Sequence, residues 1–187
     1  VGDDRVGLYD RFIFVNSSAV APGVELSKSI YSEQEIESYM IEAISSSLGM
    51  SYQNHPQQIR MAEAFFTENG YQLYLNMIEN AALTAILEEQ NYTLRTITTA
   101  PADFLTHGLD SEDVYRWALE MPVLMTYDPA DEGREAESFP MIIEAEITRV
   151  PVEEADQSPV AIDYWRLKQP PAEPADGEEQ EPQVPRY

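Results

Sequence analysis

The order of two hydrophobic periodicities along the chain restricts its fold more than any other feature. Between residues 32 and 90, apolar residues recur about every 3.6 positions, which is the spacing of amphipathic helices. Between residues 92 and 168 they alternate with polar residues, as in strands that bury one face. Helices that come first and strands that follow are typical of an α+β domain, in which helices pack on one face of a bent antiparallel sheet.

The helical half begins with a clear start signal. Ser32 and Glu35 form a capping-box pattern, in which each side chain accepts a hydrogen bond from a free amide at the helix start. Gly49 stands where a C-terminal cap belongs. One helix is therefore expected between them. Its buried face comprises Ile36, Tyr39, Met40, Ala43, Ile44 and Leu48.

Three shorter helices are expected next. Pro56 suits the first turn of the second helix, because the amides of that turn have no partner within the helix. Asn69-Gly70 predicts a turn. Two further helices are predicted after this turn, over residues 71–79 and 81–89.

The second half of the sequence contains five candidate strands. They cover residues 92–99, 101–109, 114–127, 141–149 and 160–168. Pro122 interrupts the third of them. Because proline has no amide hydrogen to donate, this strand should bend, bulge or lie at a sheet edge there.

The chain is strongly acidic. Its 187 residues include 34 Asp or Glu and 11 Lys or Arg, for a formal net charge of −23. Such a charge repels phosphate backbones, so no nucleic acid is expected as a partner. With no cysteine and two histidines, thiolate and multi-histidine metal sites are not expected either. We expect no cofactor.

Composition divides the chain into three parts. Residues 1–30 predict an extended N-terminal arm or linker, residues 31–168 the folded domain, and residues 169–187 a disordered, acidic, proline-rich tail. No run of about 18 apolar residues is present, so no bilayer-spanning segment is expected in this sequence. Val1 is not Met, so we expect that an anchor could lie upstream.

A set of short motifs resembles the DotI/IcmL family and the related TraM-type conjugation proteins. The set spans residues 32–168. In the strand half it comprises Tyr115-Arg116-Trp117, Met121-Pro122-Val123-Leu124, Thr126-Tyr127, Arg149-Val150-Pro151 and Tyr164-Trp165. In the helical half it comprises Tyr52, Asn54, Gln58, Phe66-Thr67, Gly70-Tyr71 and Leu75.

This resemblance implies an NTF2-like (cystatin-like) domain in the periplasm. It also implies a short cytoplasmic segment and one transmembrane helix upstream, tethering the domain to the inner membrane. The implied role is assembly of a type IVB secretion or conjugation apparatus, with other secretion-system subunits and further copies of the chain as partners. It implies no catalysis.

Six residues are singled out for these roles. We expect Tyr127, Arg149 and Trp165 to contribute to a protein interface, because exposed aromatic and arginine side chains dominate binding energy. Trp165 could instead pack in the core. A second set, Trp117, Pro122 and Gly70, is expected to have structural roles.

Two other functions stay open at this point. An NTF2-like enzyme or small-ligand binder would need a conical pocket with a tuned acid or base. Its candidate residues are Asp103, Asp163, Tyr115 and Tyr127. A scaffold would instead fill that space with side chains such as Phe65, Phe66 and Trp117. A third hypothesis, an acidic mimic or inhibitor, rests on charge alone.

Overall fold

The computed structural model describes residues 22–154 and 156–172. The helices are α1 (Glu33–Ser47), α2 (His55–Ala62), α3 (Glu68–Asn80) and α4 (Leu83–Gln90), with a 3₁₀ turn η1 (Glu63–Phe65) after α2. The strands are β1 (Met50–Ser51), β2 (Tyr92–Thr98), β3 (Asp103–Leu109), β4 (Tyr115–Pro129), β5 (Glu137–Arg149) and β6 (Val160–Lys168).

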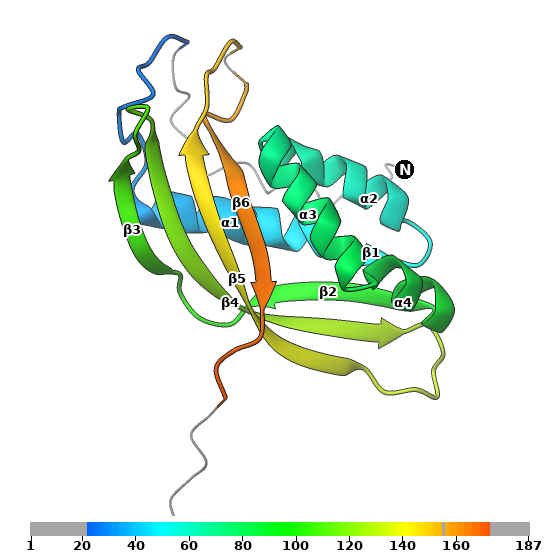
Figure 1. Cartoon of the computed structure of the whole chain (residues 1–187). Helices are drawn as coiled ribbons and strands as arrows, with labels where there is room; N and C mark the ends of the chain where they lie inside the picture. The colour runs from blue at the N-terminus through cyan, green and yellow to red at the C-terminus, as the bar shows by residue number, and fades with distance from the viewer. Residues whose placement is uncertain (1–21, 155, 173–187) are drawn as a thin grey trace, which may run out of the picture.

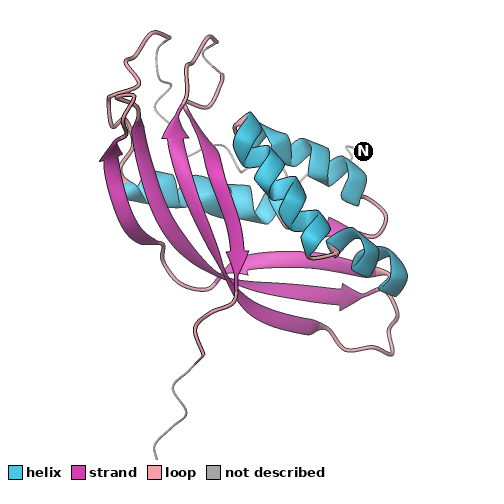
Figure 2. Cartoon of the chain, viewed as in Figure 1, coloured by secondary structure: helices cyan, strands magenta, loops and turns pink. Residues whose placement is uncertain are grey.

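One strongly curved antiparallel sheet holds all six strands. Their order is β1-β2-β4-β5-β6, and β3 also pairs with β4. The helices occupy the concave side of this sheet, as Figures 1 and 2 show. The predicted α+β architecture, with helices on a bent antiparallel sheet, is therefore confirmed.

The bend lies where β4 exchanges one neighbour for another. β3 pairs with β4 up to Glu120, and β2 pairs with it from Val123 onward. Pro122 lies between these two pairings, and its carbonyl accepts a hydrogen bond from the Thr99 amide. In an antiparallel strand the amide and carbonyl of one residue point to the same side. The missing amide of Pro122 therefore falls in the gap between β3 and β2, where no ladder partner needs it.

Alternation along β4 and β5 separates a buried face from an outer face. Odd-numbered residues from Trp117 to Met125 are buried, and the same holds for Ile143, Ala145 and Ile147. Directly paired residues share a face, so the two strands contribute jointly to one core. The alternation predicted from the sequence is confirmed for both strands.

The first helix agrees with its predicted signals. Ser32 accepts a hydrogen bond from the Glu35 amide, and the Glu35 carboxylate accepts one from the Ser32 amide. Gly49 follows the cap residue Leu48, but its φ is not in the left-handed region. Glycine is needed at this position for lack of space, because a β-carbon there would lie 2.4 Å from the Ser45 carbonyl oxygen.

The predicted turn at Asn69-Gly70 is wrong. Both residues lie in the first turn of α3, whose N-cap is Thr67. The Thr67 hydroxyl accepts a hydrogen bond from the Gly70 amide at 3.0 Å. Glycine is needed here because the Ile162 carbonyl oxygen of β6 comes within 2.0 Å of where a β-carbon would be. An Asn-Gly pair cannot reveal a tertiary contact 92 residues away in sequence.

Residues 22–31 pack against the domain before α1 begins. The Leu26 carbonyl accepts a hydrogen bond from the Tyr115 amide at 2.9 Å, which places this segment beside the start of β4. The short strand β1 was not predicted, because two residues are too few to show a period. Residues 1–21 of the predicted arm (1–30) and residues 173–187 of the predicted tail (169–187) lie outside the described residues.

Candidate interaction surfaces

Bulky side chains fill the space between the helices and the sheet. Trp117 from β4 and Tyr74 from α3 are fully buried. Phe66 stacks on Tyr74 with ring centroids 5.1 Å apart, and Trp165 meets Phe66 edge-on at 5.3 Å. The Tyr74 hydroxyl donates to the Ser47 carbonyl oxygen at 2.7 Å, which satisfies its polar end. The interior is a packed core at this point.

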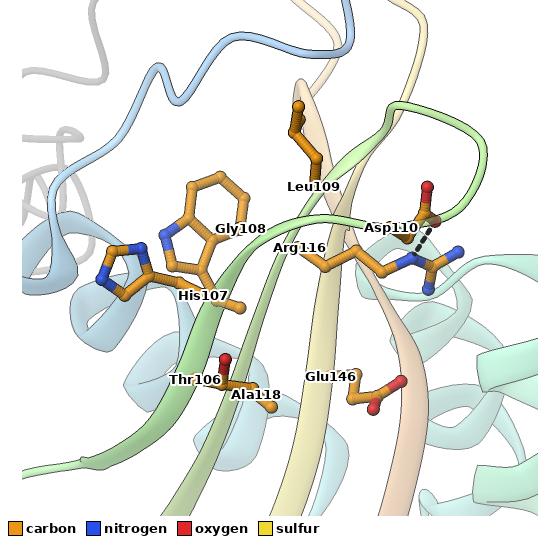
Figure 3. Close-up of a pocket in the computed structure, with 9 residues that line it drawn as sticks. Thr106, His107, Gly108, Leu109, Asp110, Arg116, Ala118 and Glu146 are labelled. Atoms are coloured by element: carbon orange, nitrogen blue, oxygen red, sulfur yellow. Dashed lines mark hydrogen bonds and ion pairs between the residues drawn. The ribbon is translucent and has the colours of Figure 1, made fainter.

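Two hollows lie at the surface of the described part of the chain. One, of about 250 Å³, opens over β3, β4 and β5, where Gly108 and Ala118 present little side chain. Figure 3 shows Arg116 and Glu146 in its wall, with Arg116 directed toward Asp110. The other, of about 490 Å³, lies at the start of α3 beside Asp163.

A polar network around Arg116 joins four elements. Its Nη1 donates to Asp163 Oδ2 of β6 at 2.7 Å, and its Nε donates to Asp110 Oδ2 at 2.6 Å (Figure 3 draws the latter). The other Asp163 carboxylate oxygen accepts from the Thr67 hydroxyl at 2.7 Å. Asp110 also accepts from the Val114 amide in the β3–β4 turn. The network therefore fixes the start of α3 against β6 and β4.

The charges in this network keep both aspartates ionised. Burial alone would raise the pKa of Asp163, but the hydrogen bonds from Arg116 and Thr67 outweigh it and lower that pKa. The Arg116 hydrogen bond, with two backbone amides, also lowers the pKa of Asp110. A general acid held neutral at pH 7 would need the opposite direction. Asp163, a candidate for acid–base chemistry, is here an ion-pair partner.

The predicted interface residues occupy three different environments. Trp165 is 2% exposed and belongs to the aromatic core, where its Nε1 has no partner among the described residues. Arg149 is 3% exposed, and its guanidinium donates to the carbonyl oxygens of Glu25, Lys28 and Pro159. Tyr127 is half-buried at the far end of β4. Of the three, Tyr127 has the most accessible surface.

The remaining candidate acids and bases do not converge. Asp103 is exposed at the start of β3, opposite Glu120. The Tyr115 hydroxyl lies 2.7 Å from His107 Nδ1 on β3, while His55 Nε2 lies 2.8 Å from Glu88 of α4. Within residues 22–154 and 156–172, no group of three or more His, Asp or Glu could hold a metal ion.

Sequence reasoning did not identify the Arg116 network. Arg116 belongs to one motif of the family resemblance and Thr67 to another, but neither motif indicates that both side chains bind Asp163. The one signal in the sequence is an arginine at an outward position of a strand. Its two carboxylate partners, Asp110 and Asp163, lie 6 and 47 residues away in the sequence.

The sequence profile of a protein family, described as the inner-membrane complex component of the type IVb secretion system, matches residues 10–168. The chain belongs to the DotI/IcmL family. The resemblance of the motifs is thereby confirmed. Membership in the DotI/IcmL family makes the protein a component of a type IV secretion system.

Solved structures similar to this DotI/IcmL chain share its fold. The periplasmic domain of DotI matches at 18% identity and a TM-score of 0.68, covering 75% of this chain and 97% of that one. A periplasmic fragment of TraM matches at 17% identity and a TM-score of 0.67, covering 75% of this chain and 99% of that one. An IcmL-like type IV secretion protein from Legionella pneumophila matches at 17% identity and a TM-score of 0.63, covering 76% of this chain and 98% of that one. A comparison with curated proteins found no match.

The described helices are all too short or too polar to cross a membrane.

Proposed function

We propose that this DotI/IcmL-family chain is a non-enzymatic assembly subunit of a type IVB secretion or conjugation apparatus. Its folded domain stands in the periplasm, tethered to the inner membrane, and acts by contacting further subunits and copies of itself. Support for the location comes from the similar structures, two of which are a periplasmic domain of DotI and a periplasmic fragment of TraM.

The packed interior is the observation that supports a scaffold most directly. An NTF2-like ligand binder needs a hollow of several hundred Å³ between helices and sheet, lined by apolar groups and a few converging polar ones. Here that space holds Trp117, Tyr74, Phe66 and Trp165, all buried. The ionisable Asp163 lies outside it, paired with Arg116. Function is thus assigned to the surface.

Tyr127 marks the surface region that we assign to subunit contact. Its ring lies 5.6 Å from Tyr92 and 5.9 Å from Phe139, measured between centroids. Phe139 is 45% exposed and lies near the start of the long strand β5. Partly exposed aromatic side chains supported by a rigid sheet are suitable anchors for a protein partner.

Copurification of the membrane complex tests this proposal. Phe139→Asp places a charge on the aromatic surface without opening the core, and it should reduce recovery of the other subunits and reduce transfer. Met61→Asp serves as the matched control, because Met61 is 58% exposed on α2 and the change adds the same charge at a position outside this surface. Unchanged recovery and transfer with Phe139→Asp would remove this surface from the proposal. The periplasmic location of the domain is tested separately, with a reporter that is active only in the periplasm fused to the full-length protein.

A further inference from the structure

The outer face of the sheet carries an apolar band at its bend. Ile97 pairs with Leu124, Leu124 pairs with Pro140, and in the adjacent row Pro122 pairs with Ile142. Paired residues share a face, and these five occupy the positions that alternate with the inward-facing residues of their strands. We call Ile97, Pro122, Leu124, Pro140 and Ile142 the outer stripe. It crosses three strands.

The outer stripe is accessible in the described part of the chain. Ile97 is 59% exposed, Pro140 is exposed, and the other three are half-buried. An antiparallel sheet with one solvated face normally presents polar residues there. A contiguous apolar band with polar borders has instead the composition of a protein contact surface.

Charged residues border the outer stripe in an ordered row. Across the sheet from β3 to β6, this row reads Asp103, Glu120, Glu144, Arg166. Lys168 lies between the two glutamates and pairs with both, which offsets their repulsion at the centre. Arg166 forms no ion pair with another described residue and is exposed. The row therefore has an acidic end and a basic end.

We infer that the outer stripe is the surface on which a second copy of this chain docks. A two-fold axis parallel to the strands, in the plane of contact and between β4 and β5, sets Pro122 and Leu124 opposite Ile142 and Pro140 of the other copy and reverses the row. Ile97 of β2 then lies opposite the end of the other copy's β6. Arg166 of one copy then lies opposite Asp103 of the other. The ion-paired middles of the two rows, Glu120 and Glu144 with Lys168, face each other. Such self-complementarity is what an isologous contact requires. This rests on the proposed self-association and names its surface.

The small size of the outer stripe sets the strength of this contact. Stable interfaces bury roughly 800 Å² per partner, and five partly buried side chains provide less. Each chain also carries a formal charge of −23, which opposes pairing. We therefore expect a dissociation constant between about 1 μM and about 1 mM in solution, at physiological salt, where charges are screened beyond about 8 Å.

Sedimentation velocity of the whole chain up to about 1 mM, a range suited to weak dimers, tests the inference. Ile97→Glu should abolish the concentration-dependent dimer. Met61→Glu on α2 is the matched control, because Met61 is 58% exposed and lies on a helix. Arg166→Glu and Asp103→Arg should each weaken the dimer at least about tenfold, which is the weight of one close charge pair. The two changes combined should restore it.

Other outcomes overturn the inference without ambiguity. A dimer that survives Ile97→Glu, or that Met61→Glu removes, places the contact elsewhere. An entirely monomeric chain at about 1 mM, the upper end of the tested range, excludes the docking as stated. Copurification with other secretion subunits could still succeed in that case, so the assembly role would stand without this surface.

Discussion

A β-carbon built on Gly70 would lie 2.0 Å from the carbonyl oxygen of Ile162. The same carbonyl accepts a hydrogen bond from the Thr67 amide at 3.0 Å, so the start of α3 is bound directly to the backbone of β6. Since the obstructing atom is backbone, it cannot rotate away. This contact joins the helical half of the chain to its last strand.

Gly70→Ala should therefore destabilise the fold by about 3 kcal/mol, the upper part of the range for overpacked sites. Chemical denaturation monitored by circular dichroism measures the change. Gly133→Ala is the matched control, because a β-carbon there meets nothing within 4 Å, and it should stay within about 0.5 kcal/mol. Equal stability of both variants would contradict the close contact.

Asp163→Asn should cost about 2 kcal/mol at pH 7, because it removes a charged hydrogen-bond acceptor from Arg116 and Thr67. The pKa of Asp163 is lowered in the fold, so its contribution is complete above the unfolded pKa of about 4 and is lost as pH falls below that value. The variant should show a smaller loss of stability between pH 5 and pH 3 than the parent, when unfolding is measured in steps of about one pH unit.

Asp128→Asn provides the comparison for that experiment. Asp128 pairs with Arg95, but both side chains are well exposed, so its loss should cost less than about 1 kcal/mol. A larger loss at Asp128 than at Asp163 would mean that the Arg116 network does not stabilise the junction of α3 and β6.

Arg149→Lys should loosen residues 25–28 while leaving the sheet folded. The Arg149 guanidinium donates to three backbone carbonyls, and burial lowers its pKa. A lysine ammonium lacks the planar fork that reaches all three. Hydrogen exchange should accelerate at the Tyr115 amide, which is bonded to the Leu26 carbonyl. An unchanged exchange rate there would show that the segment is held by other contacts.

Pro122→Ala should change the free energy of unfolding by less than about 1 kcal/mol, because the proline nitrogen already faces the gap between β3 and β2. Glu120→Pro, two residues earlier on the same face, should cost about 3 kcal/mol or more, because Glu120 is paired with β3. Thermal unfolding compares the two. A tolerated proline at residue 120 would contradict the assigned register.

Local patterns were sufficient to predict most elements of this protein. The capping box at Ser32 and the alternation along β4 and β5 depend on neighbours within a few residues, and their outcome agrees with the structure. The bend of β4 at Pro122 was also predictable, because a missing amide has the same consequence in any sheet. Family membership followed from motifs spread along the same elements.

Tertiary structure decided what distant residues do to each other. Asn69-Gly70 has the local signature of a turn, yet both residues lie in the first turn of α3, where the Ile162 carbonyl leaves no room for a β-carbon on residue 70. Trp165 and Arg149 have side chains suited to an interface, yet Phe66 covers one and the 25–28 segment covers the other. Periodicity and capping depend on residues that are neighbours in the chain. Burial, the close approach of backbone segments and the rows of the outer face depend on strand register, which only the folded sheet defines.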